Sequence, residues 1–169
     1  NTYQFAWVIA HLAGAYKNST LNLEVNGPGQ AVINELRNLK RLATSMGGAQ
    51  GRDLMDVLGS MQNYIWRRND TLGGLSNSIG YLTTSNSKER MLQYMKDYFE
   101  RGMMGILSMD TLEEMKGIVR ENGFIGAPGR GKDDRVIASA LAAVAYAEQI
   151  QPRLIAHKIT RAVSASQAS

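Results

Sequence analysis

Two short acidic motifs, far apart in the chain, carry the side chains best suited to chemistry. The first reads Leu21-Asn-Leu-Glu-Val-Asn-Gly-Pro-Gly29 and places Glu24 just before a glycine-rich turn. The second reads Lys132-Asp-Asp-Arg-Val-Ile-Ala-Ser-Ala-Leu141 and places Asp133 and Asp134 at the start of a small, apolar helical pattern. Hard divalent cations take carboxylate oxygens as ligands, and two such ions activate a water and stabilise the leaving oxygen of a phosphodiester. The motifs therefore predict a site for two Mg²⁺ or Mn²⁺ ions that hydrolyses phosphodiesters.

Each acid also has an ordinary structural interpretation. A single Glu on a strand is usually a solvated side chain. An Asp at a helix start is commonly an N-cap or a first-turn residue that the helix dipole favours. The pattern does not decide which of Asp133 and Asp134 would bind metal. The stretch Gly126–Lys132 has P-loop spacing, but Asp133 follows where that motif needs Ser or Thr for Mg²⁺, so we exclude a P-loop.

Basic side chains near the second motif are candidate contacts for DNA phosphates. Ordinary solvated surface is the alternative for each of them taken singly. The candidates are Arg130, Lys132 and Arg135, together with Arg67 and Arg68.

Composition sets the limits of these interpretations. The chain has 169 residues, 44% of them hydrophobic, a net charge of +4 and no cysteine. This length and apolar fraction fit one domain with a real core. Without cysteine there is no disulfide framework and no thiolate zinc site. No apolar run approaches the ~20 residues that cross a membrane, and the start shows no signal-peptide pattern.

Alternating patterns predict a mixture of strands and helices. Leu21, Leu23 and Val25 alternate with polar residues and predict a strand over 20–25, and residues 63–67 predict another. Residues 47–59 are poorly patterned, with a candidate short helix at 53–58. The composition of residues 69–87 favours a long loop. Short strands are predicted at 118–120 and 124–125. The predicted helices and their inward residues are 3–16 (Phe5, Val8, Ile9, Leu12, Ala13, Tyr16), 29–43 (Val32, Leu36, Leu39, Ala43), 86–101 (Met91, Leu92, Met95, Tyr98, Phe99), a shorter one capped by Asp110 and ending near Lys116, and 133–149, which Pro152 ends.

Several of these stretches together resemble the C-terminal nuclease domain of the large terminase subunit of tailed bacteriophages. The resemblance begins at Phe5–Ala13 with Tyr16, continues through Leu23–Gly29, and takes in Gly80–Thr84 with Lys88. It ends at Glu113–Met115, Gly123 and Lys132–Ala138, so it covers roughly residues 2–147. The two acidic motifs are its most specific parts.

The resemblance implies an α/β fold of the RNase H-like kind, with a central sheet flanked by helices, and a two-metal endonuclease that cuts double-stranded DNA. By that resemblance Glu24 is the acid of a later strand, and Asp134 or Asp133 is the acid of a late helix. The family's first Asp lies on a strand that this chain lacks, so the N-terminal strands are expected upstream. Ile137 stands where related resolvases place a fourth acid.

The same resemblance predicts the biological setting. Residues 1–150 would be the partial RNase H-like nuclease domain and 151–169 a basic C-terminal helix or tail. The whole protein would cut concatemeric DNA during packaging in the bacterial host cytoplasm, with the isolated fragment weak or inactive. The implied partners are double-stranded DNA, the small terminase subunit, the portal and an ATPase domain of the same chain, with no membrane; truncated edges also predict a homodimer. The alternatives are a non-catalytic DNA-binding or assembly module and another RNase H-like nuclease such as a junction resolvase.

Overall fold

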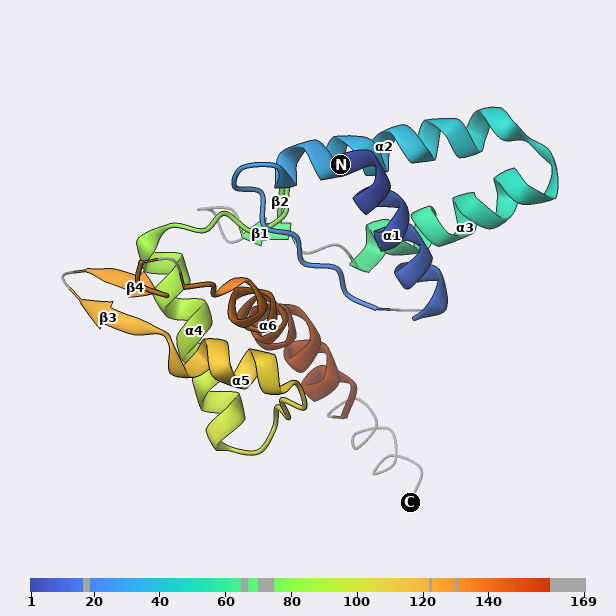
Figure 1. The fold of residues 1–169 in the computed structure, drawn as a ribbon. Helices are drawn as coiled ribbons and strands as arrows, with labels where there is room; N and C mark the ends of the chain where they lie inside the picture. Colours follow the sequence, from blue (N-terminus) through green and yellow to red (C-terminus); the bar gives the residue numbers. More distant parts are fainter. Residues whose placement is uncertain (17–18, 65–66, 70–74, 122, 130, 159–169) are drawn as a thin grey trace, which may run out of the picture. The chain divides into compact units, whose positions relative to one another are not determined.

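The structure is a computed structural model that describes residues 1–16, 19–64, 67–69, 75–121, 123–129 and 131–158, with the side chains of residues 60–78 left aside. The chain divides into two compact units, Asn1–Thr83 and Thr84–Ser169 (Figure 1). The predicted boundary at residues 150 and 151 falls within a helical stretch that runs on to Lys158.

The first unit is a group of three helices with a small hairpin. Helix α1 spans Thr2–Ala15, α2 spans Gly29–Met46 and α3 spans Gly48–Tyr64. Strands β1 (Arg67–Asn69) and β2 (Leu75–Ile79) pair antiparallel with an irregular register. Figure 1 shows α1 and α3 on the same side of α2.

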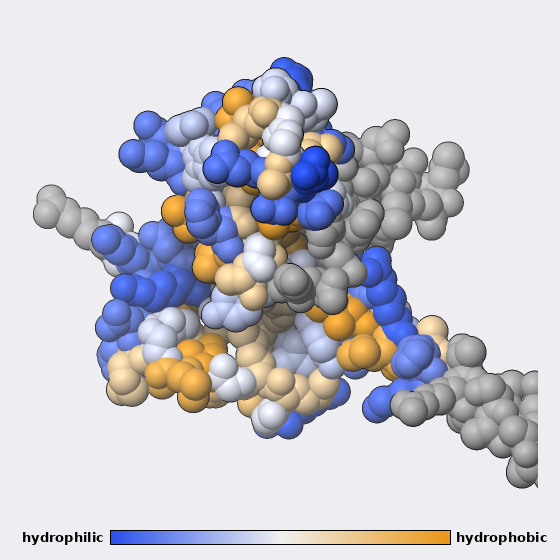
Figure 2. Space-filling view, turned by 90° about the vertical axis from the view of Figure 1, so that its right-hand side faces the viewer, coloured by the Kyte–Doolittle hydropathy of each residue, from blue (hydrophilic) through white to orange (hydrophobic). Residues whose placement is uncertain are grey.

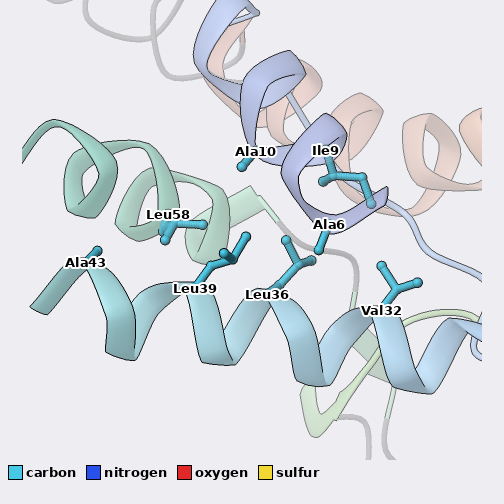
Figure 3. Packing of buried hydrophobic residues seen from close by; sticks show 8 residues of the cluster. All are labelled: Ala6, Ile9, Ala10, Val32, Leu36, Leu39, Ala43 and Leu58. Carbon is cyan, nitrogen blue, oxygen red and sulfur yellow. The ribbon is translucent and has the colours of Figure 1, made fainter. Parts of the chain in front are cut away.

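The core of the first unit lies where α2 faces α1 and α3 (Figure 3). The four inward positions predicted for α2 are all buried, which confirms that pattern. Between α2 and α3, a Cβ added at Gly51 would lie 2.8 Å from the carbonyl oxygen of Ala43. Small residues thus let the two helices approach closely. The core residues are Ala6, Ile9, Ala10, Val32, Leu36, Leu39, Ala43 and Leu58.

The inward face predicted for α1 is largely wrong. Ala6, Ile9 and Ala10 are buried, whereas Phe5 and Leu12 are more than half exposed. Helix α1 is apolar around almost its whole circumference, so periodicity alone does not identify the buried face. The short side chains of Ala6 and Ala10 face α2 and allow close packing. Exposed apolar side chains of this kind appear as orange patches on the face shown in Figure 2.

The second unit contains three helices and a second hairpin. Helix α4 spans Ser85–Glu100, α5 spans Met109–Lys116 and α6 spans Asp134–Ala145. Strands β3 (Val119–Glu121) and β4 (Phe124–Gly126) pair antiparallel, which confirms both short strands predicted there. The alanines of α6 allow close packing against α4, where Met91, Met95 and Val144 are buried.

Helix α6 does not end at Pro152 as predicted. A π-helical turn, η1 (Tyr146–Ile150), follows it directly, and residues 151–158 remain helical. The N–H of Gln151 donates to the carbonyl oxygen of Tyr146, five residues back. The wider turn rearranges the backbone hydrogen bonds just before Pro152, which has no N–H to offer.

The predicted α/β fold with a central sheet is wrong. In the described part of the chain, each of the two sheets has two antiparallel strands, and helices make up most of the structure. The alternation over 20–25 gives an extended segment with an isolated bridge at Glu24 rather than a sheet strand. Most of the poorly patterned stretch 47–59 belongs to α3, which also takes in residues 63 and 64 of the strand predicted over 63–67. Packing against α1 and α2 overrides weak propensity there.

Candidate functional site

The segment that carries Glu24 is held by a stretch far along the chain. Glu24 forms a parallel bridge with Tyr81. The N–H of Val25 donates to the carbonyl oxygen of Tyr81 at 2.8 Å, and the N–H of Tyr81 donates to that of Leu23 at 2.6 Å. These hydrogen bonds fix the backbone on both sides of Glu24.

The side chain of Asn26 adds hydrogen bonds next to the backbone pairing of Val25 with Tyr81. Its amide nitrogen donates to the carbonyl oxygen of Thr83 at 2.7 Å, and its amide oxygen accepts from the N–H of Thr83 at 2.8 Å. Two motifs that separately carry the terminase resemblance, Leu23–Gly29 and Gly80–Thr84, are therefore in direct contact. The Glu24 carboxylate itself is half-buried, with no hydrogen bond or ion pair to another described residue.

Glycine is required at two positions of this segment. A Cβ at Gly29 would collide with the carbonyl group of Glu24, and a Cβ at Gly80 would collide with Cγ1 of Val25. Gly80 also has a φ of 84°, a conformation that side chains disfavour. The backbone behind Glu24 is thus packed on both sides by glycines.

The second acidic motif lies in the other unit, at the start of α6. Asp133 is the N-cap residue, but its side chain makes no capping hydrogen bond. Instead, its Oδ2 accepts from Nζ of Lys88 at 2.8 Å, and both side chains are about three-quarters buried. A Cβ on Gly126 would lie 2.9 Å from that carboxylate oxygen and 3.0 Å from the Lys88 nitrogen. The end of β4 therefore lies directly against the ion pair.

Asp134 differs from its neighbour. It is exposed in the first turn of α6 and forms no hydrogen bond or ion pair with another described residue. Of the two adjacent aspartates, Asp134 is the one whose carboxylate is available to a ligand.

Glu114 of α5 performs the capping that Asp133 does not. One of its oxygens accepts from the backbone N–H of Arg135 at 2.9 Å, and the other accepts from the Arg135 guanidinium at 2.7 Å. The same guanidinium also pairs with Asp110 at 3.1 Å. The start of α6 is thereby tied to α5.

These contacts change the pKa of Glu114. Burial, which leaves its side chain 10% exposed, favours the neutral acid. The hydrogen bonds from the side chain and backbone of Arg135, the charge of Arg135 and the N–H of Val136 outweigh burial and lower the pKa of Glu114. The hydrogen bond to Glu114 and the charge of Asp110 likewise raise the pKa of Arg135.

The remaining predicted DNA contacts fall into three groups. Arg135 is engaged in the ion pairs with Asp110 and Glu114, whereas Lys132 is exposed without a partner among the described residues. Arg130 lies outside the described residues. Arg67 and Arg68 belong to β1, of which only the backbone is described.

The predicted meeting of Glu24 with Asp133 and Asp134 stays a prediction, because the acids belong to different units. Within each unit by itself, the described residues bring together no group of three or more His, Asp or Glu side chains that could hold a metal ion. Sequence reasoning missed the roles of Lys88, Gly126 and Glu114 near the second motif. Lys88 and Glu114 belong to stretches that carry the family resemblance, which was the available signal.

Comparison with known proteins adds no family to this picture: no protein-family model, curated protein or solved structure matches the chain. Among the described residues, no helix is both long and apolar enough to cross a membrane.

Proposed function

We propose that the chain is part of a divalent-metal-dependent DNA endonuclease of the terminase large-subunit kind. Glu24 and Asp134 would supply metal ligands, and Asp133 would join them when Lys88 releases it. The bound ions would activate the attacking water and stabilise the leaving oxygen. Lys88 would then be left to contact the negative phosphate.

One observation carries this proposal: the stretch from Gly80 to Lys88 contacts both acidic motifs. Its beginning bridges the Glu24 segment through Tyr81, and its end binds Asp133 through Lys88. Within each unit, a stretch that carries the family resemblance thus contacts one acidic motif.

The number of ligands also bears on the proposal. Each unit by itself brings at most two of the candidate carboxylates, and two ions need more oxygens than that. A two-ion site would therefore need ligands from both motifs. Substitution of Glu24 tests whether the first motif contributes to metal binding.

Metal binding is tested first, by thermal unfolding with and without millimolar Mg²⁺ or Mn²⁺. A ligand at about 100 times its Kd stabilises the folded state by about 2.7 kcal/mol. We expect this stabilisation in the wild type and a smaller one in Glu24→Ala and in Asp134→Asn. Asp56→Asn, which changes an exposed acid on α3, is the matched control and should respond as the wild type. An equal metal response in all four proteins refutes the shared site.

Cleavage is tested by nicking of supercoiled plasmid in Mn²⁺. We expect weak nicking that is lost in Asp134→Asn. Nicking that survives both Asp134→Asn and Asp133→Asn places the chemistry elsewhere and refutes the proposal.

A second function, a non-catalytic DNA-binding or assembly module, is favoured by one specific observation. Lys88 neutralises Asp133 and Glu114 caps α6, so part of the acidic cluster already has a structural role. DNA binding that persists without any metal response would identify this second function.

A further inference from the structure

The outer face of α2 has an unusual composition. Seven exposed residues follow one another at helical spacing on the side opposite the buried positions Val32, Leu36, Leu39 and Ala43 (Figure 3). All seven are amides, arginines or hydroxyl residues, and none is acidic. We call this set the α2 outer face; it consists of Gln30, Asn34, Arg37, Asn38, Arg41, Thr44 and Ser45.

Two arginines of the α2 outer face are held by asparagines rather than by carboxylates. Nη1 of Arg37 donates to Oδ1 of Asn34 at 3.2 Å, and Nη1 of Arg41 donates to Oδ1 of Asn38 at 3.3 Å. A neutral amide orients a guanidinium without cancelling its charge, and it leaves most of the five N–H donors unused. Neither arginine forms an ion pair with another described residue.

Three arginines of the second unit behave differently, whereas Arg101 and Arg153 of that unit form no ion pair with a described residue. Arg90 pairs with Glu148, Arg120 pairs with Glu89, and Arg135 pairs with two acids. Their charge is largely cancelled where they lie. On α2 the one acidic residue is Glu35, which is half-buried. It lies about 60° around the helix from Asn38, about 120° from Arg41 and about 160° from Arg37. The α2 outer face therefore keeps its positive charge.

The spacing of the two arginines suits a phosphate backbone. Arg37 and Arg41 are four residues apart, which is about 6 Å along the helix axis. Arginine holds phosphate oxygens with paired N–H groups, and asparagine and hydroxyl side chains also donate to phosphates. A helix face of this composition can contact the phosphates of a nucleic-acid strand, since no acidic side chain of the face would repel them.

We infer that the α2 outer face is a docking surface for the phosphate backbone of double-stranded DNA. Arginines that no carboxylate of a described residue pairs with favour a polyanion, and the choice of DNA as that polyanion rests on the proposed function. The α2 outer face includes none of the residues Glu24, Asp133 and Asp134 that would hold metal. It would position the duplex rather than take part in hydrolysis.

Fluorescence anisotropy with a short labelled duplex, in EDTA and over a range of salt concentrations, tests the inference with the full 169-residue chain. Each phosphate contact contributes about 0.9 to the slope of log K against log salt. If one arginine–phosphate contact contributes nothing to affinity at 1 M salt, this slope makes it contribute a factor of about 4 at 0.2 M salt and about 15 at 0.05 M salt. The double variant Arg37→Gln/Arg41→Gln should therefore bind about 18-fold more weakly at 0.2 M salt, with a slope lower by about 1.8.

Two matched variants separate a specific surface from net charge. Lys96→Gln/Lys116→Gln removes the same charge from exposed lysines that already pair with Glu100 and Glu113, and it should leave affinity nearly unchanged. Arg37→Lys/Arg41→Lys keeps the charge and should keep the slope. Equal weakening by the two glutamine double variants overturns the inference, as does unchanged binding by Arg37→Gln/Arg41→Gln in a protein with a normal unfolding midpoint.

Because EDTA removes divalent ions, the result does not depend on the metal site. Weaker DNA binding by the α2 variants together with an absent metal response would leave this inference standing and remove the proposed function. Tighter binding to a duplex RNA than to DNA in the same assay would overturn the assignment of DNA.

Discussion

Replacement of Gly80 by alanine tests the structure behind Glu24. Gly80 is buried with a φ of 84°, and an added Cβ would collide with Val25 Cγ1 and lie 2.9 Å from the carbonyl oxygen of Leu23 and 3.2 Å from Ile33 Cδ1. Two of these neighbours flank Glu24. The substitution therefore forces the bridge between the Glu24 segment and Tyr81 to move.

The expected cost has two parts. A left-handed conformation costs an alanine about 1–2 kcal/mol, and an extra methyl group in a packed core costs about 1–3 kcal/mol. Their sum predicts that Gly80→Ala lowers the free energy of unfolding by about 2–5 kcal/mol. That is a large share of the ~5–15 kcal/mol by which domains are stable.

Gly27→Ala isolates the first part of this cost. Gly27 lies in the same turn region with a φ of 55°, and an added Cβ there meets nothing within 4 Å. Urea unfolding of both variants measures the difference, which should be about 1–3 kcal/mol, the overpacking cost alone. If Gly80→Ala destabilises the protein no more than Gly27→Ala does, the packing described around Glu24 is wrong.

Three further outcomes follow from the contacts described. Leu39→Ala removes a core side chain that is 1% exposed, and should lower the free energy of unfolding by about 2–5 kcal/mol in denaturant titrations, against little change for an exposed leucine. Asn26→Ala removes both hydrogen bonds to the Thr83 backbone and should cost about 1–3 kcal/mol, whereas a loss below a few tenths would show that water replaces them. The pKa of Glu114 is lowered in the folded state, so its stabilising effect is present above its ordinary pKa of about 4.3 and is lost as the pH falls through the folded pKa. Thermal midpoints of wild type and Glu114→Gln should therefore differ most above about pH 5 and converge in acid; a constant difference would contradict the ion pair with Arg135.

Helices with a clear polar and apolar side could be predicted from the sequence. In α2, four inward positions were identified because the opposite side of the helix is polar, although Ile33, which is also buried, was missed. Helix α4 was placed to within two residues. Its cap is Thr84, which exchanges hydrogen bonds with Ser87, rather than Asn86, with which the predicted helix begins. Similar hydroxyl and amide side chains crowd this turn, so local chemistry does not select one of them.

The tertiary arrangement could not be predicted in the same way. Alternation of Leu21, Leu23 and Val25 requires an extended backbone, but it does not say how many strands lie beside it, and one bridge at Glu24 satisfies the same pattern. The candidate site shows the same limit. Acids were found by type and spacing, whereas Lys88 and Glu114 become part of it only through contacts formed by folding.

The contact between Asn26 and Thr83 also bears on the order in which the first unit folds. The two residues are separated by 57 positions, and closing a loop of that length costs roughly 3–4 kcal/mol in chain entropy. Helices α2 and α3 lie inside this loop and can form from contacts near in sequence, so they lower that cost before the ends meet. The Glu24 segment would then be the last part of the unit to take shape. A nascent chain would carry a complete α2–α3 pair while Glu24 was still unbridged, and the Glu24 segment would become ordered only when synthesis passed Tyr81.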